Sequence, residues 1–412
     1  MTGRRVVARP CLWMVVVLVG VVPAYAQVGA GALTGVVSDQ SGGAVSGASI
    51  TVTALATNRA STTTSSRDGG YLVAGLAPGE YGVRFDIAGF RTLDRRAVRV
   101  ATGETVRLDA SLTIGAVSDA VSVVGDASLL RSASASLGQV IGNQTIAALP
   151  LNGRNFITLA GLVPGVALPP NSSLPRINGG RPRTNEYLFD GISVLQPEPG
   201  QVAFFPNIDA VQEFKIETNS PPAEFGRFNG GVVNLTTKSG TNALHGTGFD
   251  FLRNEALNAR NVFASTNPAK PKYRRNQFGG VLGGPARKDR TFFFVDYQGQ
   301  RQTIGRTMIS TVPTLLQRQG VFTEAIGGRV PVIFDPATTV GNVRTQFAGS
   351  TIPANRIDPV ALALLTRYPL PTGSGTANNF QRVGDEVQDQ DQFSVRLDQQ
   401  FADNRDHIFG RL

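Results

Sequence analysis

The chain has 412 residues, a formal net charge of +9, one cysteine and two histidines. A single cysteine excludes a disulfide framework and a cysteine metal site. His245 and His407 lie far apart in the sequence without carboxylate clusters, so no zinc or iron centre and no cofactor are expected. The 47 glycines and the scarcity of helical patterns favour a mostly β protein of about two to four domains.

The first 26 residues have the pattern of a secretory signal peptide. Three arginines precede an apolar run over 11–22, which is too short to span a bilayer as a helix. A small-x-small pattern then predicts cleavage between Ala26 and Gln27. Further along, the basic run at 270–275 stands alone, so we expect a solvated loop and no nucleic-acid site.

Residues 27–113 contain short alternating strands separated by turn signals. Tyr81, Val83 and Phe85 alternate with polar or small residues, and 50–54 and 106–109 show the same period of two. This pattern predicts a small antiparallel β-sandwich. The run SRDGGYLVAGLAPGEYGVRFDIAGF at 66–90 resembles the carboxypeptidase regulatory-like domain, which is a binding or spacer module and not a peptidase.

Residues 114–125, IGAVSDAVSVVG, allow two interpretations. The run is small, β-prone and bounded by glycines, so it can be the last strand of the sandwich. It can equally be an extended segment that adds itself to the sheet edge of another protein, because strand addition needs little beyond an extended backbone. The spacing alone favours the structural strand.

The stretch AEFGRFNGGVVNLTTKSGTN at 223–242 has the glycines of a phosphate-binding loop in the wrong order. Nucleotide loops run from strand to glycines to helix, whereas here the glycines precede a β-branched run at 232–237. We therefore expect no nucleotide. The glycines permit sharp turns and close packing, and 232–237 is predicted as the terminal strand of a loop-rich unit over 126–239.

Longer amphipathic strands appear from 243 onward. Over 392–401, Phe393, Val395 and Leu397 share one face while polar residues share the other, and 291–301 repeats the pattern. Such strands with a long connection at about 302–390 are typical of an outer-membrane barrel, although a soluble sandwich gives the same alternation. The aromatic residues, the export signal and the long connection favour the barrel.

Four segments together resemble TonB-dependent outer-membrane receptors of the Oar-like branch, which carry an N-terminal regulatory-like domain. They are LPLNGRNFITLAGLVPGV (149–166), NGGRPRTNEYLFDGISV (178–194), residues 209–254 and residues 276–301. The resemblance implies a signal peptide (1–26), a sandwich (27–113), a linker (114–125), an α+β plug (126–239) and barrel strands (240–412). Transporters of this kind have 22 strands. Residues 240–412 hold about five, so we expect an incomplete barrel: a fragment, a truncated product or a relic.

The resemblance also implies functional residues and reweights 117–125 toward a TonB box, with departures from the family pattern at 119–120 and 124. The TonB-box-like residues are Asp119, Ala120, Val121, Ser122 and Val123. The plug-motif residues are Asn152, Gly153, Arg154, Asn155, Asp190, Gly191, Glu224, Phe225, Gly226, Arg227, Asn229, Gly230 and Gly231. Arg227, Asn229 and the glycines are expected to pack against the polar barrel lumen.

The function implied by the resemblance is energised import through the outer membrane into the periplasm. The expected partners are TonB or a TonB-like protein, outer-membrane lipid and a ligand that is a carbohydrate, a peptide or a metal chelate. The alternative is a surface or adhesion protein that does not transport. A secreted enzyme is disfavoured because Asp389 and Asp391 lie two residues apart beside a strand start, without a nucleophile–histidine arrangement.

Overall fold

The computed structural model describes residues 30–115, 121–124, 136–401 and 406–412. Within these ranges it leaves out Pro150, Pro170, Asn171, Ser173, Pro197, Pro199, Arg227 and 260–269. The predicted signal peptide, its cleavage site at Ala26 and Gln27, and the box residues Asp119 and Ala120 therefore lie outside the described residues. The chain divides into two compact units, 1–243 with 284–293 and 397–410, and 244–283 with 294–396 and 411–412.

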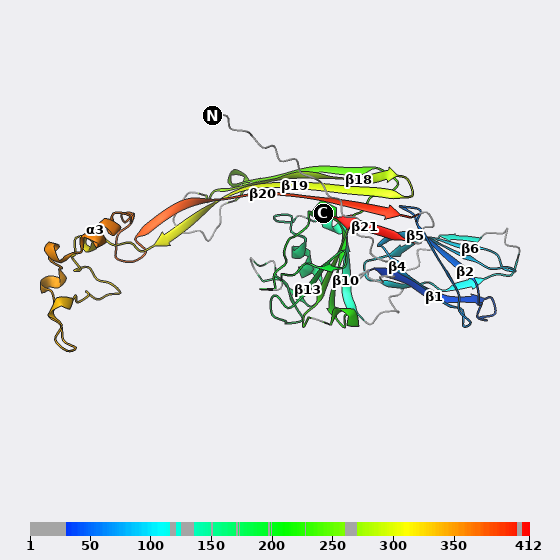
Figure 1. Ribbon diagram of the computed structural model, residues 1–412, viewed down its shortest axis with the longest axis horizontal. Coiled ribbons are helices and arrows are strands. Elements are labelled where there is room, and N and C mark those ends of the chain that lie inside the picture. Colours follow the sequence, from blue (N-terminus) through cyan, green and yellow to red (C-terminus); the bar gives the residue numbers. More distant parts are fainter. Residues whose placement is uncertain are drawn as a thin grey trace, which may run out of the picture. The chain divides into compact units, whose positions relative to one another are not determined.

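The N-terminal part of the first unit is a β-sandwich, as predicted (Figure 1). One sheet has the order β4-β1-β7, with β8 also paired to β1, and the other has the order β3-β2-β5-β6-β9. Its strands are β1 (Gly31–Asp39), β2 (Ser49–Ala54), β3 (Ala60–Thr64), β4 (Gly70–Leu76), β5 (Gly79–Asp86), β6 (Leu93–Val100), β7 (Thr105–Arg107), β8 (Ala110–Leu112) and β9 (Val121–Val124).

The predicted alternation places the sandwich core correctly. Tyr81, Val83 and Phe85 are buried in one core with Ile50 of the neighbouring strand β2 and Leu33 of β1 in the other sheet. The expectation of a purely antiparallel sandwich is wrong, because β1 pairs in parallel with β7 and β8, and β6 pairs in parallel with β9. A period of two is common to both pairings, so the sequence pattern does not distinguish them.

The second part of the first unit is an α+β domain, for which we keep the predicted name plug. It is built on a mixed sheet of order β10-β15-β16-β13-β14. Its elements are β10 (Leu137–Gly142), α1 (Asn143–Ala148), η1 (Phe156–Leu162), β11 (Val166–Ala167), β12 (Arg176–Ile177), β13 (Glu186–Phe189), β14 (Ile192–Ser193), η2 (Ile208–Ala210), β15 (Val211–Asn219), η3 (Ala223–Phe225) and β16 (Val232–Thr237). Phe156, Phe214 and Leu235 are fully buried in its core. β16 coincides with the strand predicted at 232–237.

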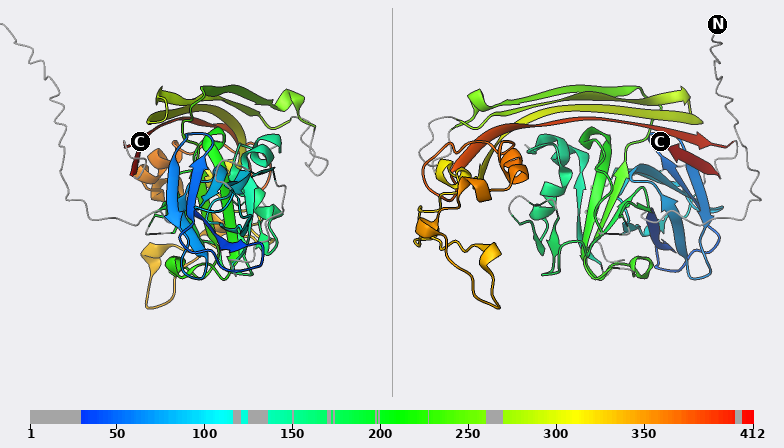
Figure 2. Two further views of the ribbon diagram at one scale, coloured as in Figure 1. Left: turned by 90° about the vertical axis from the view of Figure 1, so that its right-hand side faces the viewer. Right: turned by 60° about the vertical axis from the view of Figure 1, so that its left-hand side comes forward.

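Five long strands form one open sheet of order β17-β18-β19-β20-β21 (Figures 1 and 2). They are β17 (His245–Asn254), β18 (Tyr273–Arg287), β19 (Thr291–Ser310), β20 (Phe380–Gln400) and β21 (His407–Arg411), and η4 (Glu255–Leu257) follows β17. The number of strands agrees with the estimate of about five strands made from the sequence. Separately, none of the helices in the described ranges is long and apolar enough to cross a membrane.

Two predicted boundaries in this region are wrong. The long connection runs over 311–379 instead of 302–390, because polar residues extend β19 and β20 through pairs such as Arg306 with Glu386. The connection contains α2 (Leu315–Arg318), η5 (Pro336–Thr338), η6 (Ala348–Ser350), η7 (Ala354–Arg356) and α3 (Pro359–Leu365). The basic run 270–275 is only partly a loop, since β18 begins at Tyr273, whose ring lies 4.5 Å from the Arg253 guanidinium.

Candidate functional site

The turn between β13 and β14 is tied to the last residue of β16. Asp190 and Gly191 both adopt positive φ values, of 49° and 84°, a conformation that aspartate and glycine tolerate better than other residues. One Asp190 carboxylate oxygen accepts from the Thr237 backbone N–H at 2.9 Å, and the other accepts from the Thr237 hydroxyl at 2.6 Å. The Asp-Gly motif thus fixes the point where the chain leaves the plug.

The Asn-Gly-Arg-Asn motif forms a second loop that reaches the same region. Gly153 and Arg154 adopt positive φ values, and Asn155 caps η1 by accepting from the Ile157 N–H at 3.0 Å. The Arg154 side chain is only 9% exposed and forms an ion pair with Asp209. Burial lowers the pKa of Arg154, and the Asp209 carboxylate opposes this shift. Asn152 is exposed on the same loop.

Lys238 joins this cluster directly after β16. Its backbone N–H donates to the Ala210 carbonyl at 2.8 Å. Burial lowers the pKa of Lys238, and the Asp209 carboxylate again opposes the shift. The C-terminal end of β16 therefore gathers Arg154, Asp190 and Asp209 around Thr237 and Lys238. The sequence prediction missed Asp209, although Asn207 and Asp209 form the start of η2 with a typical asparagine cap.

The glycine pair lies at the opposite end of β16. A Cβ on Gly230 would lie 2.2 Å from the Asn185 side-chain oxygen, and one on Gly231 would lie 2.5 Å from the Glu217 carbonyl oxygen. The Gly231 N–H donates to that Asn185 oxygen at 3.1 Å, and Asn185 is 1% exposed. These glycines pack closely, as predicted, against residues of their own domain. Their packing against a barrel lumen stays a prediction.

The remaining motif residues surround this end. Phe225 is buried with Leu188 and Val232, Gly226 ends η3, and Asn229 is exposed. Arg227 lies outside the described residues. A strand and not a helix follows the glycines, so the stretch lacks the helix N-terminus that a phosphate-binding loop needs.

Residues 121–124 of the TonB-box-like segment form a strand of the sandwich. β9 pairs in parallel with β6, with Leu93 opposite Val121 and Arg96 opposite Val124. The interpretation as a last strand of the sandwich therefore describes this backbone, and the linker expected over 114–125 is paired over 121–124. β9 ends the sheet order among the described strands, so it is an edge strand. Edge strands accept further strands through backbone hydrogen bonds.

The barrel strands show apolar residues exposed and polar residues buried. Along β20, Phe393 is 66% exposed and Leu397 55%, whereas Arg396 and Asp398 are buried at 9% and 4%. The Ser394 hydroxyl donates to the buried Asp296 carboxylate at 2.6 Å. This arrangement is the reverse of a soluble sheet and is typical of strands whose outer face meets lipid.

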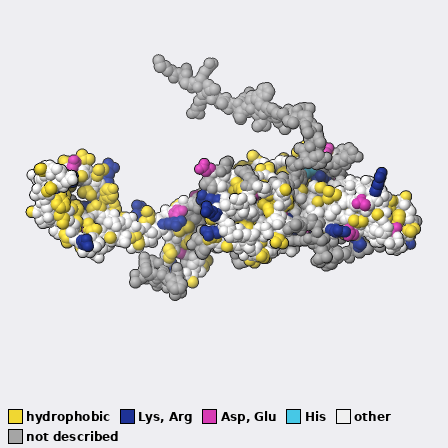
Figure 3. Space-filling model, turned by 90° about the horizontal axis from the view of Figure 1, so that it is seen from below, with side chains coloured by type: hydrophobic (Ala, Val, Ile, Leu, Met, Phe, Trp, Pro, Cys, Tyr) yellow, Lys and Arg dark blue, Asp and Glu magenta, His cyan; other side chains and the backbone are white. Residues whose placement is uncertain are grey.

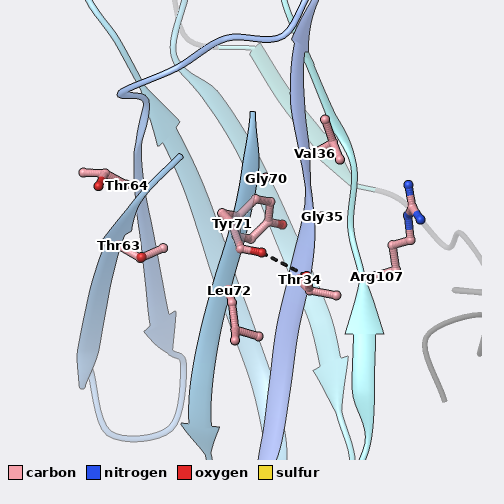
Figure 4. Close-up of a pocket in the computed structure, with 9 residues that line it drawn as sticks. All are labelled: Thr34, Gly35, Val36, Thr63, Thr64, Gly70, Tyr71, Leu72 and Arg107. Carbon is pink, nitrogen blue, oxygen red and sulfur yellow. Dashed lines mark hydrogen bonds between the residues drawn. The ribbon is translucent and has the colours of Figure 1, made fainter. Parts of the chain in front are cut away.

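A cavity in the sandwich and an exposed apolar surface are two further candidate sites. A cavity of about 570 Å³ lies in the sandwich beside Thr34, Tyr71 and Arg107, and the Thr34 hydroxyl donates to the Tyr71 carbonyl at 2.9 Å (Figure 4). Within the described residues, no group of three or more His, Cys, Asp and Glu side chains could hold a metal ion. The connection over 311–379 exposes apolar side chains, including Val340 and Val343. Hydrophobic side chains are visible on the surface at the left end of Figure 3.

Two family models match the chain. Residues 236–412 match an outer membrane beta barrel domain, and residues 32–113 match a carboxypeptidase regulatory-like domain. The latter range coincides with the sandwich strands β1–β8. These matches confirm the mostly β fold and the resemblance of 66–90, and they place the protein in the outer membrane.

A curated relative and solved structures extend the comparison. The TonB-dependent transporter Oar of Myxococcus xanthus is 30% identical over 268 residues, which cover 61% of this chain and 25% of that relative. The outer membrane transporter YddB of Escherichia coli is 15% identical, covering 64% of this chain and 31% of its own, with a TM-score of 0.36. The siderophore receptor PirA of Pseudomonas aeruginosa is 22% identical. The match covers 41% of this chain and 29% of PirA, with a TM-score of 0.31.

The relation to outer-membrane transporters rests on the family models and on Oar. The two solved structures add no argument, because their TM-scores are low. The match to Oar spans a quarter of that relative's length. Along the chain, the match to the carboxypeptidase regulatory-like domain precedes the match to the outer membrane beta barrel domain. The chain is a homologue of the TonB-dependent transporter Oar, and it matches a carboxypeptidase regulatory-like domain followed by an outer membrane beta barrel domain.

Proposed function

We propose that this protein is a TonB-dependent receptor that takes up a ligand through the outer membrane into the periplasm. In this proposal the plug is gated through the box-like residues at 117–125, and TonB or a TonB-like protein supplies the energy. The relation to Oar supports the transport role. The ligand is a carbohydrate, a peptide or a metal chelate, and the protein performs no enzymatic step.

The observation that carries the proposal is the position of β9 at a sheet edge, between the sandwich and the plug in the chain. An edge strand of small and β-branched residues offers an extended backbone to a second protein. TonB recognition by strand addition needs this backbone and few specific side chains. An adhesion protein has no use for such a segment next to a plug.

The plug sheet suggests how force at 117–125 would act. β10 is the first plug strand after this segment and lies at the edge of the sheet, where β15 is its one partner among the described strands. An edge strand has one neighbour to lose, so it separates more easily than a central strand. β16 lies in the middle of the sheet and is tied at its end by Asp190 and Thr237. Pulling would therefore remodel the β10 side first.

The second candidate is an outer-membrane surface or adhesion protein that does not transport. The apolar side chains exposed on the connection over 311–379 favour it, because such a surface can bind a partner directly. Engagement of TonB separates the two candidates, since adhesion does not require it.

The test measures retention of the purified chain on the immobilised periplasmic domain of a TonB protein. Val121→Pro and Ser122→Pro each remove one backbone donor, and successive donors along a strand point to opposite edges. We expect retention of the unaltered chain, and a loss of at least about tenfold in one or both proline variants. Val121→Ala keeps the donor and should bind normally.

A second control separates strand addition from general damage to the sandwich. Thr62 lies in β3, the opposite edge strand of the same sheet, and pairs with Thr51. Thr62→Pro should leave TonB binding intact. Absence of any retention for the unaltered chain, with the protein in the outer membrane, would favour the adhesion candidate.

A further inference from the structure

One face of the plug sheet carries charged residues that are nevertheless buried. Along β15, Phe214 and Ile216 point into the apolar core, and the alternate residues Glu213, Lys215 and Glu217 occupy the other face. Each of these three is at most 7% exposed. In the adjacent β16, Asn234 lies opposite Lys215 and Thr236 lies opposite Glu213. We call Glu213, Lys215, Glu217, Asn234 and Thr236 the polar face.

A turn of the sandwich lies on this polar face. The turn, residues 101–104, follows β6 and precedes β7, and we call it the docking turn. Thr102 is fully buried, and both its backbone N–H and its hydroxyl donate to one Glu213 carboxylate oxygen, the hydroxyl at 2.8 Å. The Lys215 ammonium donates to the Gly103 carbonyl at 2.8 Å and pairs with Glu217 at 2.5 Å.

Further contacts join the docking turn to the polar face. The Thr102 and Thr236 hydroxyl oxygens lie 2.9 Å apart. A Cβ on Gly103 would lie 3.7 Å from the Lys215 nitrogen and 3.8 Å from the Asn234 amide nitrogen, so the turn rests directly on both side chains. Arg99, at the end of β6, lies 3.5 Å from Glu213. The buried Glu213 carboxylate and the buried Lys215 ammonium thus both have hydrogen-bond partners in the sandwich.

The geometry points to a specific docking surface: we infer that the polar face of the plug binds the docking turn and holds the regulatory-like domain on the plug. The contact is polar, so its hydrogen bonds are offset by lost hydration of the charged groups. Such a contact gives a defined orientation and remains reversible. The regulatory-like domain is then a docked part of the plug and not a freely tethered module.

Docking has a mechanical consequence that rests on the proposed function. The box-like strand β9 pairs with β6, and β6 ends directly before the docking turn. In the other direction the chain continues into β10, which pairs with β15, the strand that bears Glu213 and Lys215. Force on 117–125 therefore reaches the docking contact from both sides, through the sandwich and through the plug.

Disulfide trapping tests the docking itself, without transport or ligand. In a Cys11→Ser background, the pair Thr102→Cys and Thr236→Cys places sulfur atoms where the two hydroxyls now lie 2.9 Å apart. A disulfide needs about 2.05 Å between sulfurs, which a small adjustment provides. The matched control replaces Thr236→Cys by Thr237→Cys, because the Thr237 hydroxyl donates to Asp190 and successive side chains of a strand point to opposite faces.

We expect mass spectrometry of the mildly oxidised full chain to find the 102–236 disulfide at least about tenfold faster than the 102–237 disulfide. Adding Glu213→Ala removes the acceptor of Thr102 and should slow the 102–236 reaction by about tenfold. Equal rates for the two pairs, or a 102–236 rate unaffected by Glu213→Ala, would overturn the inference.

A labelling measurement gives an independent result if oxidation distorts the turn. Thr102→Cys alone should react with a maleimide at least about tenfold more slowly than Arg107→Cys, because Thr102 is buried and the Arg107 side chain is 51% exposed. Glu213→Ala should accelerate labelling at position 102 only. Equal labelling of positions 102 and 107 in the folded protein would refute docking. If TonB binding is lost while the thiol at position 102 stays protected, only the proposed function is refuted.

Discussion

Asp190 and Thr237 are 47 residues apart in the chain, yet both oxygens of the Asp190 carboxylate accept hydrogen bonds from Thr237. The contact joins the Asp-Gly turn to the residue at which the plug ends. It lies beside the Arg154–Asp209 ion pair, so two motifs from different parts of the sequence stabilise the same end of β16.

Removing the acceptor at this contact should destabilise the plug. We expect Asp190→Ala to lower the free energy of unfolding by about 1–3 kcal/mol, because the Thr237 N–H and hydroxyl lose their acceptor. Asp190→Asn keeps one oxygen acceptor and should cost less. Urea unfolding followed by limited proteolysis of the plug measures both, and equal effects for the two variants would contradict the hydrogen-bond argument.

The glycines of the 223–242 stretch should differ in their tolerance of alanine. Gly230→Ala places a Cβ 2.2 Å from the Asn185 oxygen, and we expect a loss of about 1–3 kcal/mol in the free energy of unfolding. Gly226 is the matched control, since its φ is −67° and its Cβ would meet the Ala223 carbonyl at an ordinary 3.4 Å. Gly226→Ala should change stability by less than about 0.5 kcal/mol; a loss equal to that of Gly230→Ala would count against close packing as the cause.

Leu397 distinguishes a lipid-facing strand from a water-facing one. Its side chain is 55% exposed, so in a soluble sheet Leu397→Arg should change stability by no more than about 0.5 kcal/mol. On a lipid-facing surface the same change should cost about 2–4 kcal/mol near the membrane midplane. We expect Leu397→Arg to reduce the amount of protein assembled in the outer membrane and Leu397→Phe to leave it unchanged, as measured by membrane fractionation. Normal assembly of Leu397→Arg would argue against lipid at this face.

Lys238 should give the plug a distinct pH dependence. Burial lowers the pKa of its ammonium below the usual 10.5, so the folded state holds this proton more weakly than the unfolded chain. The contribution of Lys238 to stability therefore improves as the pH rises from its folded-state pKa toward 10.5. Unfolding free energies of the unaltered protein minus those of Lys238→Met should rise over this window, and two parallel pH profiles would contradict the assignment.

The sequence by itself determined the strands whose two faces differ in polarity. The alternation at 392–401 and 81–87 predicted which residues are buried, and the order of glycines before 232–237 excluded a phosphate loop. These patterns are local, because side chains along one strand alternate whatever the neighbouring strand is. They failed at 302–310 and 380–390, where polar residues occupy both faces and the pairing of two distant strands maintains the extended backbone.

Only the tertiary structure decided which distant residues meet. The pairing of β9 with β6, the contact of Thr102 with Glu213 across 111 residues and the closure of Asp190 on Thr237 all depend on loops that bring remote segments together. Each such contact follows from the register of a whole sheet, which a local period of two does not specify. A buried charge such as Glu213 reads in the sequence as an ordinary exposed position of an amphipathic strand, and only the docking turn from another domain makes it an interior group.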